Sequence, residues 1–254
     1  LESVLARGKV KEVIYNVDYN SFSGDPDRTG IPQPLPLYLY DERRWNDYPY
    51  VLSLTTLGRS IDILRGHGAG YNENRDKPWA WADTVQFSAR GVVEHLDARN
   101  LDKRYKQPQR TMDGMMKSFD VNLLALVRDH PDVKFIFVWP PYSILVWADF
   151  TQRGQLDLSL DFKRRFVAAL AKYPNVRIHD FQERMDWIGG LDEYFDIYHF
   201  SPRISSAIIT EISAGHERLT PENVDERNRR LREIALAANP EKIVADALAP
   251  AKPR

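Results

Sequence analysis

Three apolar runs along the chain predict β-strands. Residues 134–139 read KFIFVW, residues 176–181 read VRIHDF, and residues 10–19 read VKEVIYNVDY. KFIFVW shows no alternation of polar and apolar residues, which is typical of a strand covered on both faces in a parallel sheet. The pattern of residues 10–19 likewise predicts a buried strand.

Apolar residues spaced three or four positions apart predict helices around these strands. Residues 111–133 and 156–176 each contain one such helix, the first ending at Pro131. Residues 48–66 show the same periodicity. The inward positions are predicted to be Phe119, Leu123, Leu126 and Val127 in the first helix and Phe162, Phe166, Val167 and Leu170 in the second.

Two pairs of a hydroxyl residue and a proline predict where the last helices begin. Ser201 precedes Pro202, and Thr220 precedes Pro221. A serine or threonine caps the first amide groups of a helix, and proline suits the first helical position. The helix after Pro221 is expected to stop at Asn239-Pro240.

The alternation of helix and strand predicts an α/β fold with crossover connections. We expect residues 1–254 to form one three-layer domain with a mostly parallel sheet between helices, of the flavodoxin-like kind. Two long polar loops are expected, at about 20–47 and 66–85. Long loops in a compact domain commonly carry function.

The first eight residues, LESVLARG, have the pattern of a helix end. Leu1, Val4 and Leu5 share one face, and Gly8 is a suitable stop. A chain that opens inside a helix leads us to expect that earlier elements, including the first strand or strands of the sheet, precede this sequence.

Composition narrows the classes of function. The 254 residues carry 35 Lys and Arg against 36 Asp and Glu, so nothing points to nucleic acid or an anionic membrane as a partner. No cysteine is present, which excludes disulfides, thiolate metal sites and a cysteine nucleophile. The apolar runs are far too short to span a membrane.

Ligands of open parallel sheets bind beyond the carboxyl ends of the strands, so the residues after each strand are the first candidates for chemistry. After the last strand, Asp196 stands three residues before His199. A carboxylate can fix the tautomer of an imidazole and leave its other nitrogen to take a hydroxyl proton. The two residues are therefore candidates for orienter and general base, and the alternative is a structural polar pair in a loop.

Such a pair serves a nucleophile. Ser21 and Ser23 follow the first strand and keep the order Ser, Asp, His, but serines at such positions commonly cap turns. The single G-x-S sequence ends at Ser60 and falls inside a predicted helix, whereas a nucleophilic serine needs an exposed turn between strand and helix. The nucleophile is expected to lie outside this sequence or to be absent.

Four segments together resemble a known family. They are KEVIYNVDYNSFSG, the stretch from PLYLYDE to SIDIL, FVWPPYSILVW and FDIYHFSPRISSAI. They look like the SGNH (GDSL-like) hydrolase superfamily, in particular an envelope-side, membrane-anchored bacterial branch related in style to proteins of alginate O-acetylation and teichoic acid D-alanylation. The resemblance runs from about Lys11 to about Asn239 and implies that His199 is the general base and Asp196 its orienter. That family's G-x-S turn and the Gly-containing block after it are both missing here.

The resemblance also implies a donor to an oxyanion at the end of the first strand, usually an asparagine. Asn16 or Asn20 could serve, with a turn-forming role as the alternative for each, and Ser21 lies at the same place. Asp18 is better suited to bonding a loop, because a carboxylate cannot donate unless it is protonated.

Aromatic residues give a second set of candidates. Trp79 and Trp81 stand in KPWAWAD, and Trp139 and Tyr142 stand in WPPY. Their rings could stack on sugars, or they could plug the ends of the sheet.

The expected function is an SGNH-like esterase or acyl(acetyl)transferase domain acting on a cell-envelope or exported polysaccharide, with no cofactor or metal. Its partners would be a carbohydrate or acyl-ester substrate and envelope proteins. The domain would lie at the periplasmic or extracytoplasmic face, with membrane contact only through an anchor outside this sequence. The alternative is a non-catalytic scaffold or partner-binding subunit of an envelope complex. His179 and Asp180 with Asp196 and His199 would make a possible metal set, and a weaker third option is a metal-dependent phosphodiesterase that uses His179 and His199.

Overall fold

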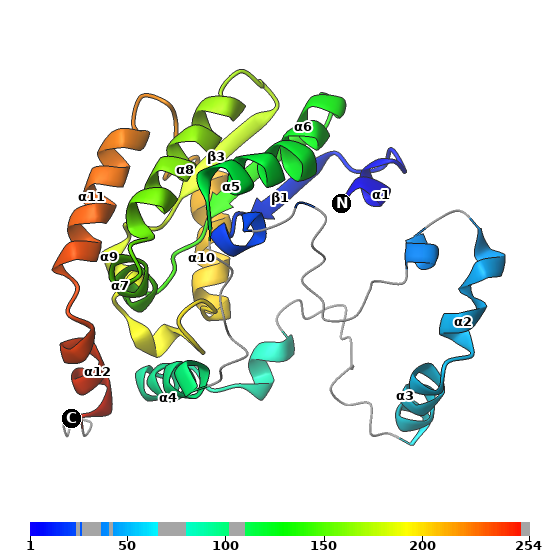
Figure 1. Ribbon diagram of the computed structural model, residues 1–254, viewed down its shortest axis with the longest axis horizontal. Coiled ribbons are helices and arrows are strands. Elements are labelled where there is room, and N and C mark those ends of the chain that lie inside the picture. Colours follow the sequence, from blue (N-terminus) through cyan, green and yellow to red (C-terminus); the bar gives the residue numbers. More distant parts are fainter. Residues whose placement is uncertain (24–25, 27–36, 41–42, 66–79, 102–109, 250–254) are drawn as a thin grey trace. The chain divides into compact units, whose positions relative to one another are not determined.

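A computed structural model of the chain describes residues 1–23, 26, 37–40, 43–65, 80–101 and 110–249 (Figure 1). The chain divides into two compact units. The larger unit comprises Glu2–Pro26 and Val85–Arg254, and the smaller comprises Leu1 and Asp27–Thr84.

The larger unit is an α/β fold, as predicted, built on a parallel sheet that has three strands within the described residues. They are β1 (Glu12–Asn16), β2 (Lys134–Trp139) and β3 (Val176–Asp180), in the order β1-β2-β3. The register pairs Asn16 with Val138 and Trp139 with Asp180, so the carboxyl ends of all three strands lie at one edge.

The strands differ in how far they are buried. From Phe135 to Trp139 every residue of β2 is buried, as the apolar run predicts. A strand does lie within residues 10–19, as predicted, but it is not buried, because β1 covers only Glu12–Asn16 and alternates exposed with half-buried positions, Ile14 being exposed. In the described residues β1 pairs only with β2, so it forms an edge of this sheet.

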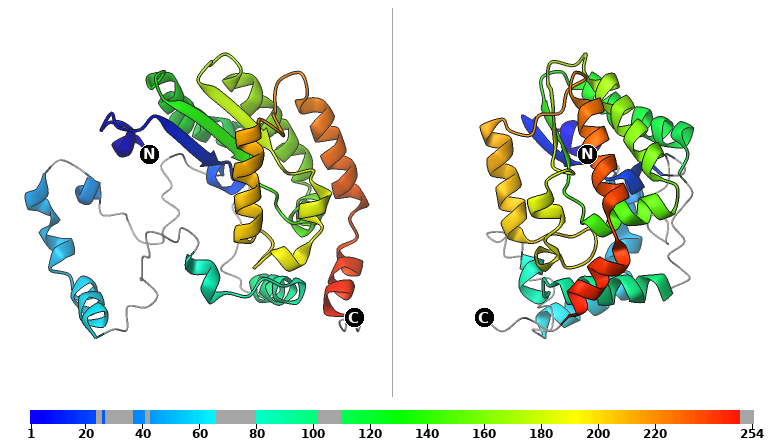
Figure 2. Two further views of the ribbon diagram at one scale, coloured as in Figure 1. Left: turned by 180° about the vertical axis from the view of Figure 1, so that it is seen from behind. Right: turned by 90° about the vertical axis from the view of Figure 1, so that its left-hand side faces the viewer.

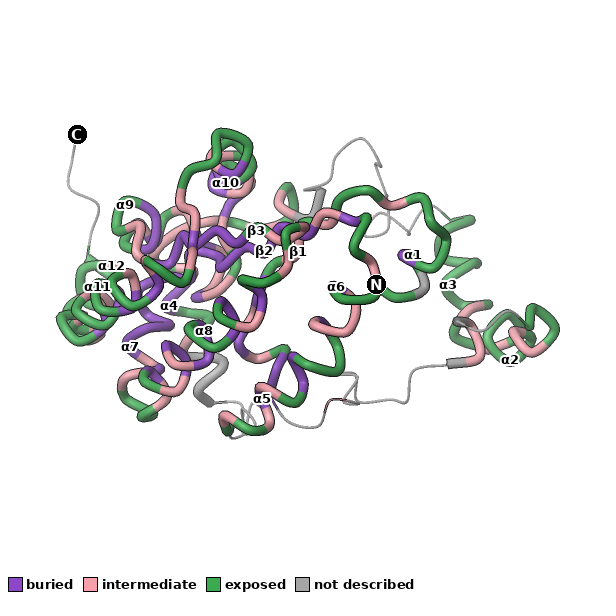
Figure 3. The backbone as a smooth tube through the Cα atoms, turned by 90° about the horizontal axis from the view of Figure 1, so that it is seen from above, coloured by how far each residue is buried: buried purple, intermediate pink, exposed green. Residues whose placement is uncertain are grey.

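Helices cover both faces of the sheet. Figure 3 shows α10 (Pro202–Ala214) on one side and α5 (Met112–Phe119), α6 (Ala125–Asp129) and α8 (Leu156–Leu170) on the other, and Figure 2 shows the same layers from two further directions. The three-layer arrangement predicted from the alternation of helix and strand is therefore confirmed.

The predicted inward faces of these helices are correct except at one position. Leu126 is only half-buried, whereas the other inward residues of both helices are buried. A π-helical turn at Asp120–Leu124 separates α5 from α6. One wide turn rotates the residues beyond it relative to a regular helix, which accounts for Leu126.

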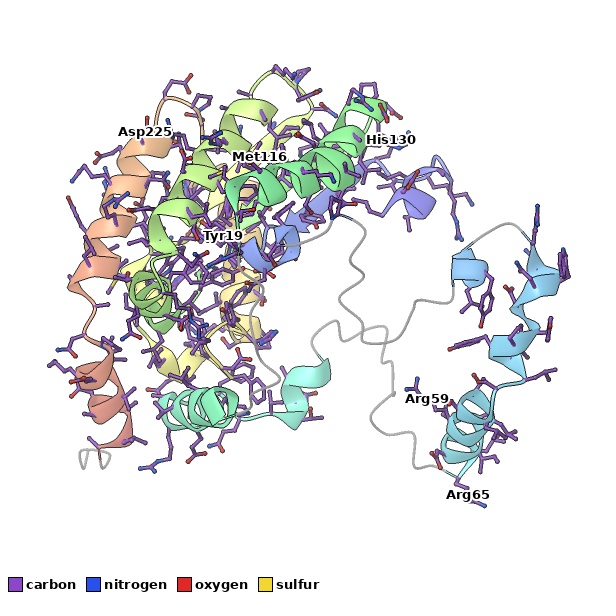
Figure 4. All side chains as sticks on the ribbon, in the orientation of Figure 1. Tyr19, Arg59, Arg65, Met116, His130 and Asp225 are labelled. Carbon is purple, nitrogen blue, oxygen red and sulfur yellow. The ribbon has the colours of Figure 1, made fainter. Side chains whose placement is uncertain are left out.

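Tyr19 lies in an aromatic core at the ends of the strands (Figure 4). It belongs to a short 3₁₀ turn, η1 (Tyr19–Phe22), and its ring centroid lies 4.8 Å from that of Trp139 and 5.8 Å from that of Phe150. Its hydroxyl donates to Gln182 Oε1 at 3.1 Å. These contacts fix the loop after β1 against β2 and the loop after β3.

Of the two helix starts predicted near the carboxyl end of the chain, one is correct and the other is not. Ser201 caps α10 by accepting from the Ile204 N–H, as predicted. Thr220-Pro221 do not begin α11 (Val224–Ala237), because Asn223 closes a turn by accepting from the Thr220 N–H at 2.8 Å. α11 ends just before Asn239, as expected. Asn239 also caps a further helix, α12 (Pro240–Leu248), by accepting from the Lys242 N–H.

Other helices have no periodic signal. α7 (Ile144–Gln152) is buried on almost every side, so its apolar residues do not alternate with polar ones. α4 (Ala89–Leu101, ARGVVEHLDARNL) likewise lacks a regular apolar spacing that would predict it. Short helices α9 (Met185–Ile188) and η7 (Leu191–Glu193) fill the segment after β3.

The first residues form α1 (Glu2–Leu5), with Gly8 in a left-handed conformation at φ 65°. Only Leu5 of the three expected apolar positions is buried, while Leu1 and Val4 are exposed. The expected helix end is thus present, but Leu1, Val4 and Leu5 do not form one buried face.

The smaller unit contains α2 (Tyr48–Val51) and α3 (Leu54–Leu64), together with the 3₁₀ turns η2 (Leu37–Tyr40), η3 (Arg44–Asp47) and η5 (Ala80–Thr84). The single helix predicted over residues 48–66 is split at Ser53, whose side chain caps α3 by accepting from the Thr56 N–H. Most of the predicted loops at about 20–47 and 66–85 lie outside the described residues.

Candidate functional site

The candidate pair lies on a short, closed loop between β3 and α10. Tyr194 and Phe200 form an antiparallel bridge, and the Phe195 N–H donates to the His199 carbonyl at 2.8 Å. The Ser201 N–H donates to the Glu193 carbonyl at 2.8 Å, just before α10 begins. The loop is therefore held by its own backbone bonds.

Two further contacts join this loop to the residues that follow β2. The Tyr194 hydroxyl donates to the Pro141 carbonyl at 2.6 Å, and the Ser143 N–H donates to the Ile197 carbonyl at 3.2 Å. The loop is thereby held at the edge where the strands end, which is where open parallel sheets bind ligands.

Asp196 and His199 are in direct contact. His199 Nδ1 lies 2.8 Å from Asp196 Oδ2, while Asp196 Oδ1 accepts from the backbone N–H groups of Tyr198 and His199, each at 2.8 Å. A carboxylate can only accept, so Nδ1 carries the proton and Nε2 holds the lone pair of the neutral ring. This is the tautomer that a general base acting through Nε2 requires.

The surroundings of Asp196 favour its ionised form. Burial by itself would raise the pKa of this carboxyl, but the hydrogen bonds from His199 and from two backbone N–H groups outweigh it and lower the pKa below its ordinary value. Asp196 is thus held as a carboxylate that orients His199.

The imidazole is open to solvent, since the His199 side chain is 64% exposed and that of Asp196 26%. A second pair shows that contact alone does not make a site: His216 Nδ1 lies 2.7 Å from Glu211 Oε2 and is equally exposed. Asp196 differs from Glu211 in its two backbone hydrogen bonds and in lying on the loop that is joined to the residues after β2.

Asp18 bonds its own loop and a neighbour, in keeping with the chemistry of a carboxylate. It accepts from the Asn20 N–H at 3.1 Å, from the Ser21 hydroxyl at 3.3 Å and from the Tyr142 hydroxyl at 2.8 Å. Asn16 is exposed at the end of β1. An oxyanion role for Asn16 or Asn20 remains a prediction.

The serines considered from the sequence bond within their own turns or helices. Ser21 donates to Asp18, Ser23 donates to the Asn20 carbonyl at 2.6 Å, and Ser60 donates to the Thr56 carbonyl at 2.8 Å inside α3. The structure adds Ser143, whose buried Oγ has no hydrogen-bond partner among the described residues. Ser143 stands between β2 and α7, and a serine between a strand and a helix is a position that the sequence itself displays.

Two of the four aromatic candidates are core residues. Trp139 is fully buried and Tyr142 is 4% exposed, so neither presents a ring face to a sugar. They plug the end of the sheet, which corrects the stacking role considered for them. Trp79 lies outside the described residues, and so does the side chain of Trp81.

The metal set considered from the sequence does not assemble. In the described part of the chain no three metal-binding side chains come together. His179 is buried, and its Nδ1 lies 2.7 Å from the His216 carbonyl. Asp180 is instead paired with Lys163 of α8, at 2.7 Å in the core.

Comparison with models of protein families, with characterised proteins and with solved structures gives no match to this chain. None of the described helices combines the length and apolar character needed to cross a membrane.

Proposed function

We propose that the protein is an SGNH-like esterase or acyl(acetyl)transferase that acts on a cell-envelope or exported polysaccharide at the extracytoplasmic face of a bacterium. The contact between Asp196 and His199 carries this proposal. It unites a fixed tautomer, an exposed imidazole and a place at the carboxyl edge of a parallel sheet.

In the proposed reaction His199 acts as the general base. Its Nε2 takes the proton of a serine hydroxyl as the oxygen attacks the ester carbonyl, and the resulting imidazolium is stabilised by Asp196. Nε2 then returns the proton to the departing alkoxide, leaving an acyl-enzyme. Water or a sugar hydroxyl then gives its proton to Nε2 and attacks the acyl-enzyme, so the acyl group passes to this acceptor and Nε2 returns a proton to the serine.

Substitution of His199 tests the proposal. In the whole protein His199→Gln should lower kcat/KM for acetyl-ester turnover about 10²–10⁴-fold, the range for loss of a general base. Asp196→Asn should also lower kcat, because the amide no longer stabilises the imidazolium.

His216→Gln is the matched control, because it removes an equally exposed imidazole paired with a carboxylate outside the loop that carries Asp196 and His199. Its turnover should equal that of the unchanged protein. Turnover that survives His199→Gln would contradict the proposal.

A partner-binding subunit of an envelope complex is the second candidate, favoured by the apolar surface of α3. Leu54, Leu57 and Leu64 are 85%, 54% and 86% exposed. If this candidate holds, Leu57→Ser should release the protein from complexes isolated by sedimentation, while His199→Gln should leave assembly unchanged and the purified protein should show no ester turnover. Full assembly of Leu57→Ser would count against it.

A further inference from the structure

A short segment after α10 covers the outer edge of β3, the edge that does not face β2. It comprises residues 215–219, which we call the edge segment. The Asp180 N–H donates to the Glu217 carbonyl and the Leu219 N–H donates to the Ile178 carbonyl, each at 2.9 Å. These bonds occupy backbone groups that an edge strand would otherwise leave open to pairing with another chain. The edge segment therefore closes one side of the sheet.

The edge segment is held closed against backbone strain. Glu217 has φ 54°, and in the described part of the chain it is the single non-glycine residue with a positive φ. The left-handed region is unfavourable for a residue with a Cβ, and such a conformation persists only where its surroundings enforce it. Arg227 and Arg184 contact the Glu217 carboxylate at 2.7 Å and 3.4 Å. The closed conformation therefore depends on the contacts that surround it.

One of these contacts comes from a buried histidine of β3. His179 is 1% exposed, and its Nδ1 lies 2.7 Å from the His216 carbonyl of the edge segment. A carbonyl can only accept, so Nδ1 carries the proton and the lone pair of the neutral ring is on Nε2. Nε2 is itself buried and has no hydrogen-bond partner among the residues that the structure describes. The closed segment thus accommodates the neutral ring and offers no acceptor for a second N–H.

The charges around the ring also disfavour its protonation. Arg218 of the edge segment bridges to His179, and Arg177 lies two residues earlier on the same face of β3. Burial, then Arg218 and Arg177, lower the pKa of His179 below its ordinary value of 6.5, against the opposing effects of the hydrogen-bonded carbonyl and of Glu217. Asp180 points to the other face of β3, where it is paired in the core. A protonated His179 would therefore be a buried cation between two others.

We propose that the edge segment is an acid-released cover of the sheet, which opens when Nε2 of His179 takes up a proton. The new Nε2–H has no acceptor in the closed form, and a buried charge without a partner is strongly unfavourable. Opening lets water reach the ring, separates Arg218 from it and frees Glu217 from its left-handed conformation. It also uncovers the backbone groups of Ile178 and Asp180 at the edge of the sheet.

The sign of the effect follows from linkage. The open segment leaves His179 in water with its ordinary pKa of 6.5, whereas the closed segment lowers that pKa. The closed form is therefore fully stable above pH 6.5, and its stability falls as pH decreases from there through the lower value. One proton is taken up on opening, so the equilibrium constant for opening should rise by up to about tenfold for each pH unit within this range.

Hydrogen exchange followed by NMR tests the proposal in the whole protein. Protection of the Leu219 and Asp180 amides, corrected for the intrinsic exchange rate at each pH, should fall by up to about tenfold per pH unit below pH 6.5. The Phe135 amide donates to the Asn175 carbonyl on the inner side of β3 and should keep its protection over the same range. Protection of Leu219 that does not change between pH 7.5 and pH 5 would overturn the proposal.

Two variants assign the effect to one ring. His179→Asn keeps an N–H donor near the position of Nδ1 but cannot take up a proton, so Leu219 should stay protected down to pH 5. His216→Gln is the matched control, because it removes the exposed imidazole of the edge segment, which is paired with Glu211, and it should retain the loss in acid. An undiminished loss in His179→Asn, or its disappearance in His216→Gln, would overturn the proposal.

A direct measurement of the ring covers the case in which His179→Asn does not fold. NMR shifts of the His179 ring in the unchanged protein should show the Nδ1–H tautomer at pH 7.5, and its protonation should coincide with the loss of Leu219 protection. A ring that becomes protonated while Leu219 stays protected would contradict the proposal. The edge segment is independent of the proposed reaction, so His199→Gln should leave the exchange of Leu219 unchanged.

Discussion

The Tyr142 hydroxyl donates a 2.8 Å hydrogen bond to Asp18 Oδ1 and so joins the segment after β2 to the segment after β1. The Tyr142 ring is buried, and burial and the Asp18 charge together raise the pKa of its hydroxyl well above the ordinary value. The phenol is therefore a donor throughout the physiological range of pH. The Tyr142 ring packs edge-on against that of Tyr198, the residue before His199, so the bond lies next to the candidate pair.

Tyr142→Phe should test what that bond contributes. Its loss should lower the free energy of unfolding by about 1 kcal/mol, a typical value for one hydrogen bond, because Asp18 keeps its bonds from Asn20 and Ser21. Urea unfolding followed by circular dichroism measures the difference. Tyr48→Phe, at an exposed position of α2, should change the unfolding free energy much less.

Lys163→Met should lower the free energy of unfolding far more than Tyr142→Phe does. It would leave the Asp180 carboxylate buried without its cation, and breaking such a pair from one side costs about 3–5 kcal/mol. Lys242→Met removes one partner of the exposed pair with Asp246 and should cost about 0–1 kcal/mol. Similar midpoints of urea unfolding for the two variants would contradict the assignment of Lys163 as a buried ionic partner.

The sequence predicts the fold well where a single pattern dominates. The uniform apolar run of β2 and the three- and four-residue spacing of α8 each allow one interpretation, and both are correct. The spacing of apolar residues does not predict α7, because a helix that is buried on nearly all sides has no polar face and therefore no helical period in its sequence. The apolar run around β1 predicts a buried strand, whereas the structure has an edge strand, and the sequence alone does not reveal which strand lies at an edge.

The candidate site is only partly readable from sequence. The spacing of Asp196 and His199 suggests an interaction, and its geometry depends on backbone bonds from Tyr198 and His199 that no spacing rule contains.

The different exposure of two leucines predicts a small loss of stability on substituting one and a large loss on substituting the other. Leu57 in α3 is more than half exposed, so Leu57→Ser should change the free energy of unfolding by about 0.5 kcal/mol or less, in the range for surface substitutions. Leu160 in α8 is buried, and Leu160→Ala should cost about 2–5 kcal/mol because it leaves a cavity. Thermal and urea unfolding measure both; a large loss in Leu57→Ser would show that its side chain is covered in solution.

The hydrogen bonds of Asp196 predict a specific loss of stability in acid. Its pKa is lower in the folded protein than in the unfolded chain, where it takes the ordinary value of 3.8. A group of this kind stabilises the fold above its unfolded pKa, and the stabilisation disappears as pH falls from there through the folded pKa. Protonation would break the bond from His199 Nδ1–H and weaken those from the backbone.

Asp196→Asn separates this contribution from those of other acids. The amide oxygen can still accept from the backbone N–H groups of Tyr198 and His199, but the side chain no longer titrates. Urea unfolding from pH 6 down to below pH 3.8 should therefore show a smaller loss of stability in Asp196→Asn than in the unchanged protein, with the two curves converging only in this acid range. Parallel curves would mean that Asp196 has the same pKa folded and unfolded, and that the bond to His199 does not form in solution.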